Sequence, residues 1–404
     1  MPHPDVHWLN LTPEDGHYTF GYYDRCPWDA ETRLHLALRI PQQERLPEPG
    51  EPADVGVVDR ETRRFHKVAE TLAWCHQQGA MTLWLKHRPR TFIYNDFARD
   101  GDGWKPIARI HSLDEGAVSH YDTPIYTLSP DGRWGAALNF GRIPRRGYSY
   151  ALAPLPLENP APNLDEDGLF IVDIHTGATR LIASYRQFIA AHPLAYDLTG
   201  EGDQPVYMWL NHAIFNCDAS RVMVLFRYSP SVTQTRPWRT YMFTMNLDGS
   251  DLRCSLSDIF WRGGAISHQI WGRTPDEILV DADWGFHGFG HEYIVFDETR
   301  HPFQAQRISR GMGPAGHLNF SPDGRWLAAD TYPDQDGIQR LALVDVATGA
   351  LTEIGRFRHQ TPGAVGDIRC DLHPRWSADS KLLTIDTIHD GERKIYLLDV
   401  SAHF

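Results

Sequence analysis

The sequence contains no long apolar run and little cysteine. No stretch reaches the roughly 18 consecutive apolar residues of a membrane-spanning helix, and the N-terminal MPHPDVHWLNLTPEDG lacks the apolar centre of a signal peptide. The five cysteines are odd in number and far apart, which argues against a disulfide framework. We therefore expect a protein of the cytoplasm with reduced thiols and no membrane partner.

Positive charge is scarce as well. The 52 acidic residues outnumber the 39 lysines and arginines, and the formal net charge is -13 at pH 7. This balance argues against nucleic acid or an anionic membrane as the main partner. Lysine occurs only at positions 67, 86, 105, 381 and 394. The other basic residues are arginines, which form bidentate pairs with carboxylates, although genome base composition is the simpler explanation for this preference.

Several catalytic signatures are missing too. The chain has no Gly-rich phosphate loop, no Gly-x-Ser-x-Gly elbow and no Cys-x-x-Cys pair, which disfavours nucleotide, serine-hydrolase and redox chemistry. Apolar residues make up 42% of the chain and aromatic residues 12%, which is enough to bury a core. The 33 glycines and 28 prolines are spread along the chain, which favours short strands and turns over helices.

Two sequence patterns recur along the chain. The first is a turn followed by an apolar run, as in FSPDGRWLAAD (320–330), where Pro presets φ, Asp bonds its own backbone and Gly accepts a positive φ. Its other copies are LSPDGRWGAALNF (128–140), WSADSKLLTID (376–386) and the weaker FNCDASRVMVLF (215–226). The second is a strand that ends in Asp and a polar turn, as in VGVVDRETRR (55–64), LFIVDIHTGATR (169–180), YIVFDETRHP (293–302), LALVDVATGALT (341–352) and IYLLDV (395–400).

Together the two patterns predict four-stranded units of about 40–50 residues, which are typical of a β-propeller. We expect an all-β chain that forms a single seven-bladed β-propeller domain over residues 1–404. The predicted blades lie at about 17–64, 71–114, 117–188, 205–257, 262–309, 312–357 and 366–404. An insertion at about 142–168, rich in proline and tyrosine, is predicted to form a loop over one face. Two β-sandwiches are the alternative, which the even spacing of the repeats disfavours.

Four histidines share one position in consecutive repeats. They are His212, His268, His317 and His373, in NHAIF, SHQIW, GHLNF and LHPRW. Because the first strand of each propeller blade lines the central channel, these imidazoles are predicted to meet at one mouth. His120 lies further from its turn and is expected nearer the rim of that mouth. The alternative is the histidine of WD40-type propellers, which hydrogen-bonds within its own blade.

Other polar side chains are predicted at the same mouth. From the first blade the segment FGYYDRCPW is expected to reach this mouth, and from the second blade the segment CHQQG. Aromatic faces suit sugar rings, and Tyr121, Tyr148, Tyr150, Trp271 and Trp284 also fall near this face, although most propeller aromatics belong to the core. The residues expected to contact a substrate are Tyr22, Tyr23, Arg25, Gln78 and Arg375.

A metal site is predicted from RCDLHPRW (369–376). Asp371 and His373 are two residues apart and share a face if the stretch is extended. With His317 of the preceding repeat they form a set that suits a divalent cation, Mn²⁺ in the first place, with Zn²⁺ or Ca²⁺ as alternatives. The other interpretation is that Asp371 orients His373 or pairs with Arg369 or Arg375.

Arg227 interrupts the apolar run VLFRYS. A cation at such a place is costly unless it is paired, so we expect it either to bind a substrate carboxylate through two parallel bonds or to form a salt bridge to a neighbouring blade. Histidine bases and nearby cations suit removal of a proton next to a carboxylate. A uronic acid offers such a proton at C5, and loss of the group at C4 completes a β-elimination. We therefore expect a small anionic oligosaccharide as the substrate.

At these residues the sequence resembles the seven-bladed propeller polysaccharide lyases. SHQIW, GHLNFSPDGRWLAADTYPD and RCDLHPRWSADSKLL are similar to oligogalacturonate lyases and, more loosely, to ulvan and rhamnose–glucuronate lyases. The resemblance to oligogalacturonate lyases implies that His268 is the base, that Arg227 assists it, and that His317 and His373 hold Mn²⁺. The sequence departs from that family at Asp371, where a histidine is expected, and at Ile368, where a glutamine is expected.

The looser resemblance implies catalytic groups from earlier blades, where the nearest histidines are His120 and His212. The expected function is thus a lyase that cleaves oligosaccharides containing uronic acid by β-elimination, with His120 or His212 as a further acid or base. One alternative is a glycoside hydrolase, rhamnosidase-like, on the same face, which would need a pair of carboxylates. The other is a non-catalytic scaffold like TolB or WD40 proteins, in which the histidines are structural.

Overall fold

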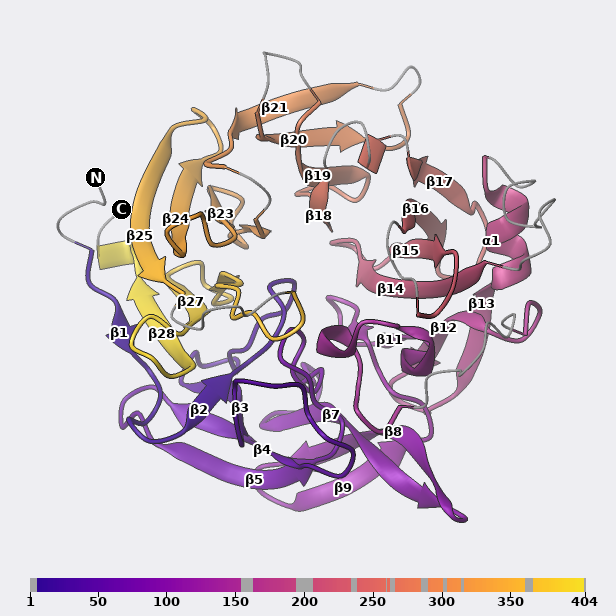
Figure 1. Ribbon diagram of the computed structural model, residues 1–404, viewed down its shortest axis with the longest axis horizontal. Helices are drawn as coiled ribbons and strands as arrows, with labels where there is room; N and C mark the ends of the chain where they lie inside the picture. Colours follow the sequence, from indigo (N-terminus) through magenta and orange to yellow (C-terminus); the bar gives the residue numbers. More distant parts are fainter. Residues whose placement is uncertain are drawn as a thin grey trace.

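The computed structural model describes residues 6–153, 163–193, 206–233, 238–258, 260–261, 266–284, 290–300, 304–313, 316–359 and 366–402. The strands in these ranges form seven antiparallel sheets of four strands each, arranged around a central axis like the blades of a propeller (Figure 1). The predicted all-β, seven-bladed β-propeller is therefore confirmed. Within the described ranges no helix is long and apolar enough to cross a membrane.

The first four blades follow the chain from the centre outwards. Blade one has β2 (His17–Thr19), β3 (Leu34–Ile40), β4 (Ala53–Asp59) and β5 (Phe65–Thr71). Blade two has β6 (Leu83–Trp84), β7 (Thr91–Asp100), β8 (Gly103–Ser112) and β9 (Gly116–Tyr121). Blade three has β10 (Thr127–Leu128), β11 (Trp134–Ala137), β12 (Gly168–Asp173) and β13 (Thr179–Ser184). Blade four has β14 (Tyr207–Phe215), β15 (Arg221–Ser229), β16 (Arg239–Asn246) and β17 (Arg253–Leu256).

The last three blades complete the ring. Blade five has β18 (Ser267–Trp271), β19 (Glu277–Ala282), β20 (Glu292–Asp297) and β21 (Ala305–Arg310). Blade six has β22 (Leu318–Phe320), β23 (Trp326–Asp330), β24 (Ile338–Asp345) and β25 (Leu351–Arg358). Blade seven has β26 (Arg375–Trp376), β27 (Leu382–Thr387) and β28 (Lys394–Asp399). The short helices are α1 (Tyr185–Ala191), η1 (Phe140–Arg142), η2 (Arg146–Tyr148) and η4 (Val400–Ala402).

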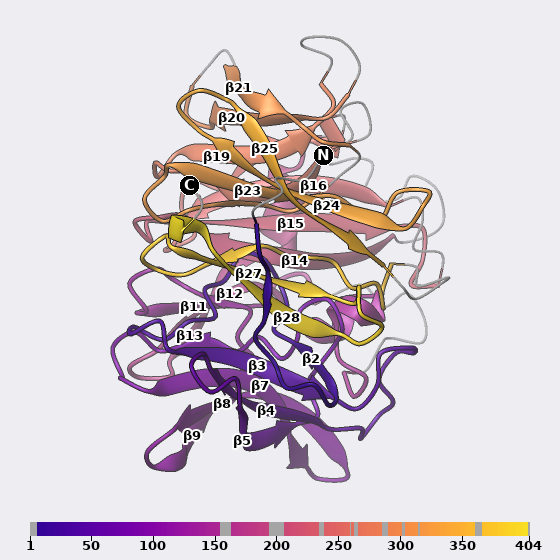
Figure 2. The same ribbon diagram turned by 90° about the vertical axis from the view of Figure 1, so that its left-hand side faces the viewer.

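The outer strand of blade seven comes from the other end of the chain. β1 (Leu9–Asn10) pairs with β28, so Leu9 faces Leu397 and Asn10 faces Tyr396. The indigo N-terminal segment runs across the yellow strands of the last blade in Figure 2. The sequence analysis assigned only residues 366–404 to this blade. The N-terminal contribution closes the ring by hydrogen bonds between two ends of the chain.

The repeated turns form as the sequence predicts. In the copy at 320–330, Ser321 Oγ lies 2.6 Å from Asp323 Oδ1 and accepts the Trp326 amide at 2.9 Å, while Gly324 has φ +71°. The strands that follow these turns are apolar on both sides because a neighbouring blade covers each face. Every residue of β27, which follows the turn of the last copy, is buried, for example.

The boundary between blades two and three differs from the expectation. Residues 116–121 form β9, the outermost strand of blade two, where His120 pairs with Arg109 of β8. His120 was expected near the channel mouth, and this placement is wrong. The side chain is 52% exposed on the outer edge and lies near Asp122.

The segment at 20–25, between β2 and β3, crosses the central channel and forms a floor. Arg375 of blade seven donates to the Gly21 carbonyl at 2.8 Å, and Asn319 of blade six donates to the Tyr23 carbonyl at 2.7 Å. The Tyr23 hydroxyl donates to the Gln269 carbonyl of blade five at 3.3 Å. We name residues 20–25 the channel plug. The plug carries two aromatic rings from blade one to the histidines of the opposite blades.

The described part of the insertion lies over the channel. Arg145 donates to Asp367, in the segment that precedes blade seven, at 2.8 Å, and the Gln77 amide of blade two donates to the Gly147 carbonyl at 3.1 Å. A Cβ at Gly147 would collide with the Asp367 backbone, so only glycine allows this approach. Residues 154–162 of the insertion lie outside the described residues.

Candidate functional site

The structure brings together the four histidines that share a position in the repeats. The ring centroids of His268 and His317 are 3.8 Å apart, and those of His317 and His373 are 4.2 Å apart. The fourth histidine, His212, contacts the others through Tyr22 of the channel plug. The Tyr22 ring centroid lies 5.1 Å from that of His212 and 5.0 Å from that of His373. Blades four to seven therefore contribute one imidazole each to a common cluster.

Three of these histidines have an unusual backbone. His212, His268 and His373 have φ values of +54°, +44° and +47°, in the left-handed region that non-glycine residues avoid. The pairing registers shift at Asn211/Ile214 and Ser267/Ile270, so β14 and β18 contain bulges at their histidines. Bulges redirect side chains, and strained backbone of this kind persists where the surrounding structure fixes it, often at functional sites.

A cavity of ≈ 250 Å³ opens beside the cluster. Its polar and aromatic lining includes Tyr22, Arg145, Tyr148, Trp209, His212, Arg227, Trp238, His268, Tyr332 and Arg369. None of the lining residues that the structure describes is an aspartate or a glutamate. Three guanidinium groups and flat rings suit a small anionic ligand with apolar faces.

The hydrogen bonds of His268 set its tautomer. Its Nδ1 lies 2.6 Å from the Gly316 carbonyl oxygen. Because a carbonyl only accepts, Nδ1 carries the proton and Nε2 is unprotonated. Nε2 lies 3.1 Å from the hydroxyl of Tyr332, which also lines the cavity. Burial lowers the pKa of His268 well below its usual value, so the ring is neutral near pH 7.

Arg227 is the cavity arginine without a carboxylate. It donates to Thr240 Oγ1 at 3.2 Å, and its guanidinium lies 5.5 Å from the ring centre of Trp238. In the described part of the chain no ion pair is formed by Arg227, whereas Arg145 pairs with Asp367 and Arg369 with Asp371. Burial lowers the pKa of Arg227 to about 10, which leaves it charged at neutral pH. An incoming carboxylate would supply the missing partner.

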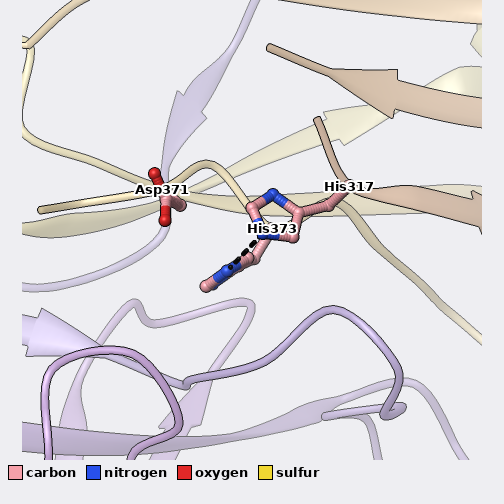
Figure 3. Close-up of side chains that lie close together, drawn as sticks. All are labelled: His317, Asp371 and His373. Atoms are coloured by element: carbon pink, nitrogen blue, oxygen red, sulfur yellow. Dashed lines mark hydrogen bonds between the residues drawn. The ribbon is translucent and has the colours of Figure 1, made fainter. Parts of the chain in front are cut away.

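His317, Asp371 and His373 lie close together (Figure 3). Their candidate ligand atoms are all within 4.8 Å of one another, and the Nε2 atoms of the two histidines are 3.2 Å apart. Two cis nitrogens at bonds of about 2.1 Å to one metal are about 3.0–3.4 Å apart, so the pair fits one cation. His317 Nδ1 lies 3.0 Å from Asp330 Oδ1, which keeps Nε2 free for a metal, and burial lowers the pKa of His373 well below its usual value.

The third member of this set has a competing partner. Burial opposes ionisation of Asp371, but the adjacent Arg369 guanidinium makes its pKa lower than usual. Arg369 binds both carboxylate oxygens, with Nη2 2.7 Å from Oδ2. The structure therefore shows the Asp371–Arg369 pair, which the sequence analysis gave as an alternative to metal binding. Both histidines fit a divalent cation, and Asp371 would reach it by exchanging one bond to Arg369.

The remaining residues of the expected substrate contact occupy different places. Tyr22 lines the cavity, and the Tyr23 ring packs 5.0 Å from the His317 ring beneath it. Three others are buried below the floor or inside a blade, with protein partners of their own. Gln78 donates to the Tyr126 hydroxyl, Arg25 lies 3.6 Å from Asp24, and the fully buried Arg375 donates to Asp386. These three do not line the cavity.

Sequence reasoning missed several residues of the site. Asp330 accepts hydrogen bonds from His317 and from the His373 amide, and Tyr332 contacts His268. Both belong to AADTYPD, at the end of the second strand of its blade, where Asp281 and Asp386 occupy equivalent positions. This repetition was a usable signal. Arg145 had none, because its ion-pair partner Asp367 comes from a distant segment, and Arg369 was expected only as a partner of Asp371.

Comparison with known proteins supports the fold. No family model and no curated protein matches the chain. An oligogalacturonate lyase from Vibrio parahaemolyticus has a TM-score of 0.61 at 14% identity, covering 99% of this chain and 96% of that chain. An oligogalacturonate lyase in complex with manganese has a TM-score of 0.64 at 15% identity, covering 99% and 95%. The Swd1 β-propeller domain of Myceliophteria thermophila has a TM-score of 0.50 at 13% identity, covering 96% and 99%.

At these identities the similarity shows the fold alone. The chain has the propeller architecture of the oligogalacturonate lyases along nearly its whole length. The expected roles of individual residues therefore depend on the geometry of this site.

Proposed function

We propose that this chain is a lyase that cleaves short oligosaccharides containing uronic acid by β-elimination. The observation that supports it is the pairing of two groups in one cavity. His268 is neutral with Nε2 unprotonated, and Arg227 is a cation without a carboxylate partner among the described residues. A base and an unpaired cation are what proton removal beside a carboxylate needs.

In the proposed reaction Arg227 binds the uronate carboxylate. Nε2 of His268 removes the proton at C5, the electron pair forms the double bond between C4 and C5, and the bond from C4 to the leaving oxygen breaks. Tyr332 donates its proton to that oxygen. Burial raises the pKa of Tyr332 well above its usual value, so the phenol is protonated beforehand. The proton on His268 then returns to Tyr332 across 3.1 Å, which restores the site.

His212 is a second neutral imidazole in the cavity, and we keep it as the alternative acid or base. His120 has no part in the proposal because it lies on the outer edge of blade two. His317 and His373, with Asp371, would hold a divalent cation, Mn²⁺ in the first place and Zn²⁺ or Ca²⁺ as alternatives. Such a cation stabilises negative charge that develops on a carboxylate.

Two alternatives are less well supported. Glycoside hydrolysis commonly uses two carboxyl groups, and the described cavity lining has none. In a non-catalytic scaffold the histidines would bond within their own blades. His317 does so with Asp330 of blade six, but His268 bonds to the next blade through Gly316, and the His317 and His373 rings meet across blades six and seven.

The test is incubation of the purified protein with oligomers of galacturonate, glucuronate and alternating rhamnose and glucuronate, with and without Mn²⁺. A lyase produces the ultraviolet absorption of a conjugated unsaturated uronate, and His268→Gln should abolish it. New reducing ends without that absorption would identify a hydrolase. No product from any of these substrates, with the protein folded and metal-loaded, would refute the proposal.

A further inference from the structure

His268 Nδ1 is hydrogen-bonded to the peptide group that joins Gly316 to His317. Its carbonyl oxygen accepts from His268 Nδ1 at 2.6 Å. Its N–H donates to Asp330 Oδ1, also at 2.6 Å. The same peptide group is therefore hydrogen-bonded on one side to a carboxylate and on the other to the proposed base.

Asp330 is well placed to fix this peptide. Its side chain is buried and accepts from His317 Nδ1 at 3.0 Å and from the His373 amide at 3.0 Å, in addition to the His317 amide. A Cβ at Gly316 would collide with the carbonyl oxygen of Asp330, so only glycine lets the two segments lie this close. The carboxylate has no freedom to turn away from the peptide.

We propose that Asp330 is a positioning residue for His268 and acts through this peptide group. Its negative charge polarises the amide, which makes the Gly316 carbonyl a stronger acceptor for Nδ1–H. The ring is thereby held in the tautomer that keeps Nε2 unprotonated and directed at Tyr332 and the cavity. A carboxylate does the same by direct contact in hydrolase triads, where it fixes the tautomer of the catalytic histidine. The effect on rate depends on the proposed function, whereas the tautomer itself does not.

Blade seven provides a matched control. Asp386 is the last residue but one of β27, much as Asp330 is the last residue of β23, and it accepts from the Phe20 amide of the channel plug at 3.2 Å. It is fully buried too, with Arg375 as its ion-pair partner. No hydrogen bond connects Asp386 to His268 among the described residues. Removal of the Asp386 charge should therefore weaken a buried contact between blades without changing a hydrogen bond of His268.

The experiment compares Asp330→Asn with Asp386→Asn. Changes in groups that orient an active residue typically cost about 10–100-fold in activity, so kcat of D330N should fall by that factor while KM stays within about threefold. In D386N, kcat should stay within about threefold of the native value even if the melting temperature of D386N falls as much as that of D330N. Equal losses of kcat in the two variants, or native kcat in D330N, would overturn the proposal.

A spectroscopic measurement tests the tautomer independently of activity and of variant folding. Full-length protein labelled with ¹⁵N-histidine, with Zn²⁺ as the only divalent cation, should show His268 with Nδ1 protonated and Nε2 unprotonated, assigned by the signal lost in His268→Gln. A native protein with Nε2 protonated would refute the inference. If the native protein shows this tautomer and Asp330→Asn loses it, but no unsaturated product forms, the proposed function fails and the positioning role stands.

Discussion

The Nε2 atoms of His317 and His373 face each other at 3.2 Å, although the two rings come from different blades. Asp330 fixes both residues, one through its Nδ1 and the other through its backbone amide. Two neutral nitrogens cannot share this space without a proton or a cation between them. A proton between the two nitrogens gives the hydrogen bond of this pair, and a divalent cation held by both histidines and Asp371 would take its place.

Mn²⁺ should stabilise the folded protein, and His317→Ala should remove that effect. A cation present at about 100 times its Kd adds about 2.7 kcal/mol to the free energy of unfolding. Thermal denaturation with Mn²⁺ and after chelation measures it, together with metal analysis of the dialysed protein. His212→Ala is the matched control, because it removes another channel histidine and should leave the metal-dependent shift intact. Identical shifts in native protein and in H317A would exclude this pair as the metal site.

Replacement of Arg227 by methionine should weaken substrate binding and raise stability. Arg227 has no described ion-pair partner and is desolvated, so the relief of this charge should outweigh the lost contacts with Thr240 and Trp238. The substrate carboxylate, in contrast, loses a charge-assisted pair. We expect KM for an oligouronide to rise about tenfold or more, with a higher melting temperature.

Arg369→Met provides the contrast, because it leaves the buried Asp371 without its partner. That loss should destabilise the protein by about 3–5 kcal/mol. If R227M is destabilised as strongly as R369M, Arg227 is a structural ion-pair member and our assignment is wrong.

At position 268 glycine should be tolerated better than alanine. The backbone of His268 has φ +44°, which costs an L-residue roughly 1 kcal/mol or more relative to glycine. His268→Gly and His268→Ala should both lose activity, with the glycine variant unfolding at higher denaturant concentration. At position 317, which is not among the residues with positive φ, the order should reverse. The same order at both positions would mean that the bulge of β18 is not strained.

The protein should lose stability as the pH falls below the usual histidine pKa. Among the described residues burial lowers the pKa of nine histidines, and the largest effects fall on His35, His76, His212, His268 and His373, with the pKa of His76 at about 3. The unfolded chain therefore binds more protons than the folded one between about pH 6.5 and each folded pKa, so stability rises with pH across that window. Each such histidine contributes up to about 1.4 kcal/mol per pH unit.

Denaturant unfolding at several pH values measures the slope of this dependence. His76→Gln, which lies outside the cavity and the candidate metal site, should reduce the slope by the contribution of one proton. A stability that does not change between about pH 7 and about pH 5 would show that these rings accept protons in the folded state.

The sequence alone determined the architecture and the register of the histidines. The turn at 320–330 and its copies specify where strands begin, because Pro, Asp and Gly act on the local backbone. Equal spacing then places His212, His268, His317 and His373 at equivalent positions, and ring closure brings them together. Turn signals repeated along the chain are therefore enough to predict the propeller and the shared position of the four histidines. It was insufficient for His120, because the inner strand β10 has only two residues and the segment before it belongs to the previous blade.

Only the tertiary structure decided which groups satisfy one another. The pairing of Arg145 with Asp367 and the crossing of the channel by Tyr22 and Tyr23 join segments more than 200 residues apart. The same holds for the closing pair of β1 and β28. These contacts depend on the path of loops that carry no repeating pattern. Whether a buried cation such as Arg227 is paired depends on every neighbour that burial brings near it, and no local spacing records those neighbours.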